Sequence, residues 1–498
     1  MLYIHILSLP CVLRCSRAAA SWTQEDGAPN LRAILTNTSI KWSSNTKISF
    51  PGDGDFINAT TRWTVFRPPT YQAAVSPATE PDVSTAIRVA SENSIPFLGT
   101  GGRHGYGTTL GNLQGGLALD LSKLNSVSVD KDAGTLTVGP GVHFGDVLDP
   151  VFNAGYMLPT GSCSCVGILG ATVGAGIGRL SGLYGLLLDQ LISARVVTAV
   201  GQMVTVSNDT NPDLFWGIRG AGANLGLLTS ATFQLSPLVN NGDFSSYDMI
   251  FPAAKNGSYF DVLASFNDGS SAFPAKLSAA SAISYNSTTG EILANWAYVG
   301  SQDEADLIIK PVLDLDPSYI DRRVISWPRF TAEAQFGLDA ALCEVNKTND
   351  IYGINTKNLD TATFTSIFKQ VGDYYAQWPD GQGTTITLEA FPNQASLAVP
   401  EDATAYPWRD AQYNILLQFT WEASGNTVEE PSTRLAQSIR EQIASSSGYG
   451  GLTVYVNYAH GDEQIEEIYG RDKLSRLVEL KRAWDSNNAF SFNNPLPT

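Results

Sequence analysis

Glycine is concentrated in one part of this 498-residue chain, and this restricts the fold more than any other feature. The chain has 45 glycines, and 21 of them fall among the 87 residues from Gly99 to Gly185. Glycine weakens helices and permits turns and close backbone approaches, so the pattern predicts a mixed α+β fold and not a helical bundle. Three glycine-rich segments in or just after this region, 99–107, 161–178 and 216–226, need an explanation.

The first glycine-rich segment, residues 99–107, follows a short apolar strand expected at 95–98 and contains His104. The backbone N–H groups of such a loop can converge on phosphate oxygens. The glycine spacing does not match the GxGxxG dinucleotide fingerprint, and no long helix is expected after it, so a Rossmann domain is not predicted. A plain turn in a β-rich protein is the alternative.

The second segment contains Cys163 and Cys165 and has glycine at positions 174, 176 and 178. Positions without side chains would let a flat aromatic ligand lie against the backbone. Three separated glycine segments, one with a histidine and one with cysteines, indicate an extended cofactor. A glycine-rich structural sandwich without a ligand is the alternative.

Composition sets aside several classes of partner. The chain has 31 Lys+Arg against 48 Asp+Glu, a formal charge of -17, and no basic stripe, so nucleic acid binding is not expected. Residues 1–20 resemble a signal peptide, and no other segment is apolar enough to span a membrane, which predicts a secreted protein. We also expect a monomer. Glycosylation sequons agree with this route and lie at Asn37, Asn58, Asn208, Asn256, Asn286 and Asn346.

Three cysteines remain after the leader, at positions 163, 165 and 343. A bridge between Cys165 and Cys343 is one alternative, but sequence does not establish the proximity that a disulfide needs, so free buried thiols are expected. Only three histidines remain as well, which predicts no metal site.

Hydrophobic patterns predict elements over most of the chain. They indicate a helix after the capping residue Thr79, a helix over 144–153, a hairpin turning at Gly201, and a helix from Asp472. Antiparallel strands are predicted at 294–299 and 413–421, and a further strand at 452–458. The domains predicted are 21–238 with 445–498 for a cofactor, and 239–444 for a substrate.

Segments 97–107, 161–178, 213–233 and 452–497 together resemble the berberine bridge enzyme-like FAD-linked oxidoreductases of the vanillyl-alcohol oxidase superfamily, the fungal members above all. The resemblance implies a PCMH-type FAD-binding domain of two α/β subdomains plus an α+β substrate domain with an antiparallel sheet. It also implies a flavin bound covalently twice, through His104 to the 8α-methyl group and through Cys163 to C6. The other positions that it places at the flavin are Gly99, Thr100, Gly101, Gly102, Arg103, Gly161, Val166, Gly167, Gly170, Gly174, Gly178, Asn457 and Asn493.

Three positions depart from this resemblance. Arg103 stands where many members have a glycine directly before the histidine. Asn414 occupies the place where the plant alkaloid enzymes have a glutamate, and Ala171 replaces a histidine near the flavin. Asparagine does not accept a proton in a useful pH range. The mechanism of those enzymes is therefore not expected to transfer intact.

The remaining candidates for a catalytic base are tyrosines. Tyr455 and Tyr458 come first, although their pKa values near ~10 would have to be lowered. Arg409 is a candidate for an activating or substrate-anchoring charge, with an interdomain ion pair as its alternative. Glu389 is a lower-ranked base.

The resemblance predicts an FAD-linked oxidase that oxidises an alcohol, an amine or an activated C–H carbon of a fungal secondary metabolite, with O2 reduced to H2O2. In family members a small residue at the position of Val166 lets oxygen reach the flavin, so the resemblance favours an oxidase over a dehydrogenase. A carbohydrate oxidase is the first alternative, for which Trp296, Trp327, Trp408 and Trp421 would have to line a groove. The second is a flavin-retaining binding protein with little activity, favoured by Asn414 and Ala171.

Overall fold

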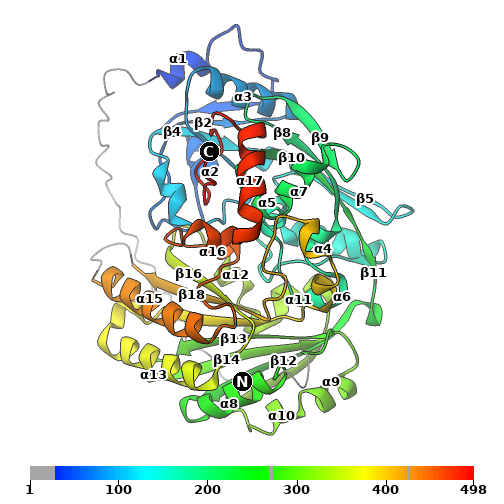
Figure 1. Ribbon diagram of the computed structural model, residues 1–498, viewed down its shortest axis with the longest axis vertical. Coiled ribbons are helices and arrows are strands. Elements are labelled where there is room, and N and C mark those ends of the chain that lie inside the picture. The colour runs from blue at the N-terminus through cyan, green and yellow to red at the C-terminus, as the bar shows by residue number, and fades with distance from the viewer. Residues whose placement is uncertain (1–28, 269–272, 423–426) are drawn as a thin grey trace.

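The computed structural model of this protein describes residues 29–268, 273–422 and 427–498. The predicted leader lies outside the described residues. Two lobes are stacked along the long axis of the molecule (Figure 1). The upper lobe is built from residues 29–238 and 452–498, and the lower lobe from residues 243–446. Strands and helices alternate irregularly along the chain, so the prediction of an α+β fold is confirmed.

The first sheet of the upper lobe has four strands, in the order β1-β2-β4-β3. Helix α3 begins as predicted, because the Thr79 side chain accepts a hydrogen bond from the Asp82 N–H and Pro81 fits the first turn. Its apolar side packs on the sheet through Val83, Ala86 and Ile87. The elements are α1 (Leu31–Leu35), β1 (Lys47–Ser49), α2 (Gly54–Thr60), β2 (Tyr71–Ser76), α3 (Glu80–Glu92), β3 (Phe97–Thr100) and β4 (Gly116–Asp120).

The second sheet of the upper lobe has five strands, in the order β5-β6-β10-β8-β9. The predicted hairpin is its β8-β9 edge, and Gly201 has the positive φ of 76° that the turn requires. Helices α4, α5 and α7 pack around it. The elements are β5 (Val127–Asp130), β6 (Thr135–Val138), α4 (Phe144–Asn153), β7 (Tyr156–Met157), α5 (Ile168–Gly174), α6 (Ser181–Tyr184), β8 (Leu191–Val197), β9 (Met203–Ser207), α7 (Pro212–Ala221), β10 (Leu227–Gln234) and β11 (Ser236–Pro237).

The lower lobe is one antiparallel sheet of seven strands, in the order β15-β12-β14-β13-β17-β18-β16. One face is apolar and is covered by α8, α13 and α15 at the bottom of Figure 1. The elements are β12 (Asp243–Pro252), α8 (Asn256–Ser265), β13 (Leu277–Tyr285), β14 (Gly290–Tyr298), α9 (Gln302–Ile308), α10 (Lys310–Leu313), β15 (Tyr319–Ser326), α11 (Trp327–Glu333), α12 (Asp339–Leu342), β16 (Thr348–Thr356), α13 (Thr361–Gln377), β17 (Thr385–Ala390), α14 (Gln394–Leu397), β18 (Tyr413–Trp421) and α15 (Glu429–Ser446).

The other face of this sheet turns toward the upper lobe and is polar. Strand register places seven residues in one row across it, so their side chains share this face. The row runs Asp321, Asp248, Asn295, Ala280, Glu389, Asn414 and Asn355.

The chain then returns to the upper lobe, and here the predicted strand at 452–458 is wrong. Residues 452–455 are irregular, and Val456–Tyr458 form a single 3-10 turn. The hydrogen bonds of this segment go to several elements: the Tyr455 N–H donates to the Asn355 side chain and the Val454 N–H to the Glu467 carbonyl. Its hydrogen bonds with β16 are confined to Asn355 in the described residues and do not continue as a ladder, so apolar alternation alone misassigned the segment. Helices α16 (Ile465–Tyr469) and α17 (Arg471–Trp484) follow.

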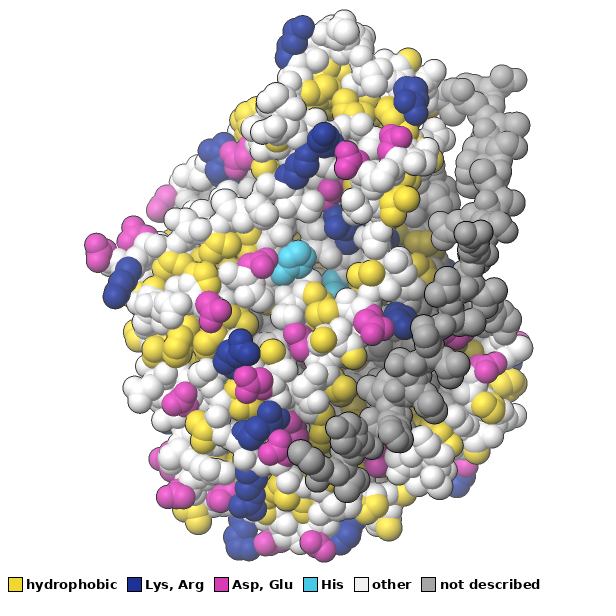
Figure 2. Space-filling view, turned by 180° about the vertical axis from the view of Figure 1, so that it is seen from behind, with side chains coloured by type: hydrophobic (Ala, Val, Ile, Leu, Met, Phe, Trp, Pro, Cys, Tyr) yellow, Lys and Arg dark blue, Asp and Glu magenta, His cyan; other side chains and the backbone are white. Residues whose placement is uncertain are grey.

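The surface has no segregated charge on the face shown in Figure 2, where basic and acidic side chains are interspersed. Among the described residues, no helix is both long and apolar enough to cross a membrane.

Candidate active site

The loops that carry His104 and Cys163 touch each other through glycine. A Cβ atom on Gly102 would lie 2.6 Å from the Gly167 nitrogen, and one on Gly167 would lie 2.8 Å from the Gly102 nitrogen. A side chain at either position would separate the loops. The glycine pair therefore brings the loops of the predicted histidine and cysteine tethers together.

His104 is partly buried beside an aromatic side chain. Its ring stacks on Trp63, with 4.3 Å between centroids and 17° between planes. Burial disfavours the imidazolium and lowers the pKa of His104 to about 4, so the ring is neutral at physiological pH. Its Nε2 atom is buried and has no hydrogen-bond partner within the described part of the chain. A neutral, unpartnered imidazole is the state that attachment to a cofactor requires.

Cys163 is a free, half-buried thiol. Burial, followed by the carboxylates of Asp339 and Glu389, raises the pKa of the Cys163 thiol to about 12. The thiol is therefore protonated at rest, which keeps it unreactive in the free protein.

The other two cysteines form a disulfide, so the prediction of free thiols at Cys165 and Cys343 is wrong. Their Cα atoms lie 5.8 Å apart. The approach has a local cause: the backbone N–H of Ser164 donates to the Asp339 carboxylate at 2.9 Å, and its hydroxyl donates to the same carboxylate at 2.5 Å. These bonds hold the cysteine loop against α12 of the lower lobe, a contact that sequence does not reveal.

Glu389 on β17 is the buried carboxylate of the site. Burial raises the pKa of Glu389 to about 7, although a hydrogen bond from Tyr458 and the charge of Arg179 both act to lower it. The Tyr458 hydroxyl donates to Glu389 Oε2 at 2.9 Å. In the sheet register Glu389 lies directly beside Asn414 on β18. A carboxylate is thus present one strand away from the position where the family resemblance led us to expect one.

The two tyrosines have pKa values unlike those of a base. Burial raises the pKa of Tyr455 to about 12, and burial together with Glu389 raises that of Tyr458 well above its usual value. The Tyr455 hydroxyl accepts hydrogen bonds from the Gly176 N–H at 3.0 Å and from Asn457 Nδ2 at 2.6 Å. Both tyrosines therefore remain protonated and act as hydrogen-bonding groups.

Two predicted cations are neutralised by the protein itself. Arg409 donates two hydrogen bonds to the Asp189 carboxylate, at 3.0 and 2.8 Å, in a buried pair that joins the lobes. Arg103, at φ 54°, pairs with Asp120 at 2.5 Å. The structure therefore favours the interdomain ion pair for Arg409 over an active-site role.

Among the other predicted cofactor residues, one glycine is open to solvent and others are packed against protein atoms. Gly170 faces open space, whereas a Cβ on Gly174 would meet the Asn457 amide at 2.2 Å and one on Gly178 would meet the Thr160 carbonyl at 2.1 Å. Asn457 also donates to the Ala171 carbonyl. Three further glycines leave little room for a side chain: Gly99 faces Leu227, Gly101 faces the Pro140 carbonyl, and Gly161 faces the Phe144 ring. Thr100 is the last residue of β3, and Val166 follows the disulfide-bonded Cys165 in the chain. The Asn493 carbonyl accepts a hydrogen bond from Asn224 Nδ2 at 3.4 Å.

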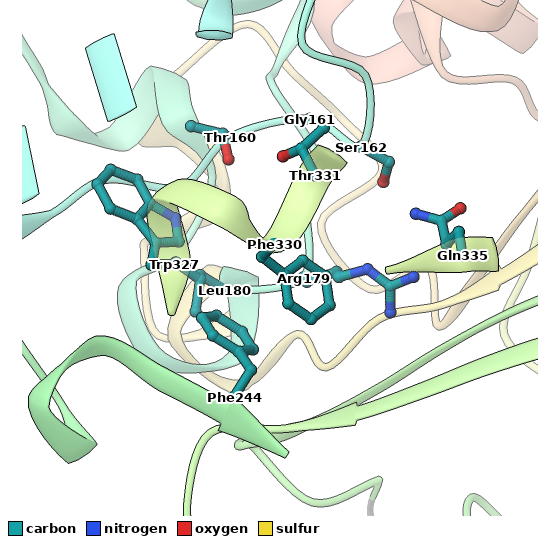
Figure 3. Close-up of a pocket in the computed structure, with 10 residues that line it drawn as sticks. All are labelled: Thr160, Gly161, Ser162, Arg179, Leu180, Phe244, Trp327, Phe330, Thr331 and Gln335. Atoms are coloured by element: carbon teal, nitrogen blue, oxygen red, sulfur yellow. The ribbon is translucent and has the colours of Figure 1, made fainter. Parts of the chain in front are cut away.

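A pocket opens next to the cysteine loop, between the lobes (Figure 3). It is lined by Thr160, Gly161, Ser162, Arg179, Leu180, Phe244, Trp327, Phe330, Thr331 and Gln335.

Arg179 was not among the predicted site residues. A signal for it exists in the sequence, because Arg179 is the only charged residue between Asp149 and Asp189. Trp327 lines the pocket as well, whereas Trp296 and Trp421 are buried in the core on the helical side of the sheet.

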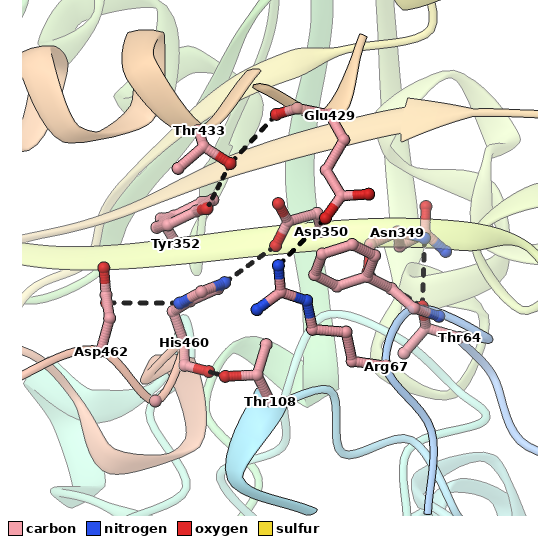
Figure 4. Close-up of polar contacts among 12 residues, drawn as sticks. Thr64, Arg67, Thr108, Asn349, Asp350, Tyr352, Glu429, Thr433, His460 and Asp462 are labelled. Carbon is pink, nitrogen blue, oxygen red and sulfur yellow. Dashed lines mark hydrogen bonds and ion pairs between the residues drawn. The ribbon is translucent and has the colours of Figure 1, made fainter. Parts of the chain in front are cut away.

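A second polar cluster joins the C-terminal segment to the lower lobe (Figure 4). His460 Nε2 lies 3.0 Å from Asp350 Oδ1, and Nδ1 lies 3.3 Å from Asp462 Oδ1. The ring stacks on Tyr352 at 3.9 Å. Burial opposes the charge of His460, but the two carboxylates outweigh it and raise the pKa of His460 to about 9. This charged cluster holds the lobes together at one side of the site.

Comparison with known proteins agrees with this geometry. The FAD binding domain family matches residues 71–207, and the berberine and berberine-like family matches residues 454–497. The FAD-linked oxidoreductase srdI of Neurospora crassa is 46% identical over 94% of this chain and 93% of its own length. The FAD-linked oxidoreductase OXR1 of Pyricularia oryzae is 47% identical over 97% of this chain and 94% of its own length.

Two solved structures show the same fold at low sequence identity. The BBE-like 1 protein of Physcomitrella patens superimposes with a TM-score of 0.81 at 23% identity, over 94% of this chain and 99% of its own. The glucooligosaccharide oxidase of Acremonium strictum, which carries a 6-S-cysteinyl, 8α-N1-histidyl FAD, gives a TM-score of 0.81 at 22% identity over the same shares. The PCMH-type fold and the FAD-linked chemistry predicted from the sequence are therefore confirmed, and the chain belongs to the berberine bridge enzyme-like family of FAD-linked oxidoreductases.

Proposed function

We propose that this protein is an oxidase that holds FAD through two covalent bonds, to His104 and Cys163, and uses Glu389 as its catalytic base. The observation that carries the proposal is Glu389 itself, a buried carboxylate with a pKa of about 7 on the sheet face above the glycine loops. An acid whose pKa lies near the working pH both accepts and releases protons efficiently. The contact between the Gly102 and Gly167 loops supports the double attachment.

A bound flavin supplies the hydride acceptor, and O2 takes up the two electrons to give H2O2. Glu389 would accept the proton of the substrate O–H or N–H group as the neighbouring C–H carbon gives up its hydride. Tyr458 holds that carboxylate in place by a 2.9 Å hydrogen bond. Asn414 lies beside it with its Oδ1 atom buried and unpartnered among the described residues, so this amide is available to a substrate hydroxyl or amine.

For the substrate, we infer an alcohol, amine or activated C–H compound of fungal secondary metabolism. The similar oxidoreductases come from fungi. A carbohydrate oxidase would need a groove lined by aromatic rings, and the burial of Trp296 and Trp421 speaks against their use in one. The buried base also favours an active enzyme over a flavin-retaining binding protein.

The test is anaerobic reduction of the purified flavoprotein with a panel of aromatic alcohols, amines and oligosaccharides, followed by peroxide measurement in air. We expect aromatic alcohols or amines to bleach the flavin and to release one peroxide per turnover. The E389Q variant should bind the same compounds but reduce slowly, and E441Q, at an exposed position of α15, is the control. Bleaching by oligosaccharides alone would replace this proposal with the carbohydrate oxidase, and no bleaching by any compound would support the binding protein.

A further inference from the structure

The pocket next to the cysteine loop contains one charged residue, Arg179, that no step above uses. Its side chain is buried, with 7% of the residue exposed. The guanidinium Nη1 donates to the Ser278 hydroxyl on β13 at 3.1 Å. Nε and Nη2 are also buried, and neither has a hydrogen-bond partner among the described residues. A buried guanidinium with two unsatisfied donors is costly unless another group completes its hydrogen bonds.

The two unsatisfied donors have a specific geometry. Nε–H and Nη2–H point in parallel from the same edge of the guanidinium plane, the edge that forms paired hydrogen bonds with a carboxylate. The third nitrogen is held by Ser278, so this edge is fixed in direction. In Figure 3 the guanidinium extends toward the side of the pocket where Gln335 lies.

The charges around Arg179 leave room for an anion. None of the ten described residues that line the pocket is acidic. The nearby Asp248 is already paired with Arg323 at 2.9 Å. Because the pKa of Glu389 is raised to about 7, this carboxyl is only partly ionised near neutral pH. Burial lowers the pKa of Arg179 only to about 10, so it stays charged.

One wall of the pocket is apolar and aromatic, and the polar side chains of Thr160, Ser162, Thr331 and Gln335 line other parts of it. The rings of Phe244 and Phe330 lie 4.6 Å apart, and Trp327 completes this wall. The Arg179 guanidinium lies 5.4 Å from the Phe330 ring centre. Such a wall can stack against the flat apolar body of a ring-bearing ligand.

We propose that Arg179 is a substrate-binding residue that takes a carboxylate attached to an aromatic or other flat apolar body. The proposal rests on the proposed function, because it places that substrate between the base Glu389 and the loop of Cys163. Arg179 and Glu389 interact electrostatically, and residues 160–162 of the pocket directly precede Cys163. A substrate carboxylate bound to Arg179 would therefore direct the carbon to be oxidised toward Glu389 and toward the loop of Cys163.

The test is equilibrium binding of benzoate and of benzamide, its neutral isostere, to the flavoprotein at constant ionic strength, followed by calorimetry and by the flavin difference spectrum. A paired hydrogen bond to a charged group predicts that wild-type protein binds benzoate about ten- to a hundredfold more tightly than benzamide. R179Q should reduce this ratio to below about twofold, and R179K should keep part of it. R329Q is the control, because Arg329 lies on the helix that lines the pocket but is exposed and paired with Glu333.

Equal binding of the two compounds by wild-type protein would overturn the inference, as would a benzoate preference that survives in R179Q. The wild-type comparison decides the matter even if R179Q does not fold. Binding does not depend on turnover, so the two proposals fail separately. A protein that prefers benzoate but oxidises nothing refutes the oxidase, and one that releases peroxide without any preference for the carboxylate refutes only the role of Arg179.

Discussion

At the scale of single residues, the site depends on where the sheet places one carboxylate. The position where the family resemblance leads us to expect a glutamate carries Asn414, and the neighbouring strand supplies Glu389 at the paired position. The apolar neighbours Leu388 and Ala390 point into the core, so alternation alone puts Glu389 on the opposite face. What sequence does not give is the burial that moves its pKa toward neutrality.

Replacing Glu389 with glutamine should lower activity and raise stability. We expect kcat/KM to fall by about 10²- to 10⁴-fold because the base is lost. A buried carboxyl with a raised pKa costs stability above its unfolded pKa, and this cost is complete above pH about 7. The free energy of unfolding of E389Q should therefore exceed that of wild type by up to about 3 kcal/mol at pH 8.5 and approach it near pH 4. Denaturant titrations at both pH values check this, and an unchanged activity would remove Glu389 from the mechanism.

Removing the Tyr458 hydroxyl should change the pH profile. In Y458F the carboxylate of Glu389 loses a hydrogen bond that lowers its pKa. The acid limb of the kcat/KM profile, which rises as Glu389 deprotonates, should therefore move to higher pH by about one unit. If Tyr458 were itself the base, Y458F would lose activity at every pH and show no shift.

At the scale of elements, several contacts hold the lobes around the site, among them the disulfide between Cys165 and Cys343 and the cluster at His460. Both join segments that are far apart in the chain. Helix α3, helix α4 and the β8-β9 hairpin were predictable because caps, apolar spacing and turns are local signals. The disulfide and the irregular segment 452–455 were not, since both depend on distant partners.

The disulfide should stabilise the folded protein without serving the chemistry. The C165S/C343S variant should lose about 2–4 kcal/mol of unfolding free energy, because the bridge closes a loop across a separation of 178 residues. The bonds of Ser164 to Asp339 remain in this variant, so flavin attachment should persist. Denaturant unfolding and the absorbance of the unfolded protein measure the two effects, and loss of the flavin would show that the bridge is needed to place Cys163.

The His460 cluster should make stability depend on alkaline pH. Its pKa is raised in the folded protein, so its contribution is complete below about pH 6.5 and is lost as the pH rises through about 9. Wild type should lose up to about 3 kcal/mol more than H460Q between pH 6 and pH 9.5. H143Q, which changes a partly exposed histidine, is the control, and equal slopes for wild type and H460Q would contradict the assignment.

At the scale of the whole molecule, the glycines clustered between Gly99 and Gly185 now have separate roles. Some allow loops to touch, as Gly102 and Gly167 do, while Gly174 and Gly178 make room for Asn457 and for the Thr160 carbonyl. The prediction of an extended cofactor came from this clustering and from the resemblance. The spaces that side chains would occupy at Gly174 and Gly178 are filled by protein atoms, so a ring against this backbone would have to approach it from another side. Asn457 comes from the C-terminal segment of the same lobe, far from Gly174 in the chain, so no local pattern reports this contact.

The double attachment of the flavin is the central claim, and acid denaturation tests it most directly. Wild type, H104A, C163A and the double variant are precipitated in acid, washed and redissolved, and their visible absorbance and intact mass are recorded. We predict that the flavin stays with the polypeptide in wild type and in each single variant, and that only H104A/C163A releases it. A colourless wild-type precipitate, or a single variant that releases all of its flavin, would contradict the claim.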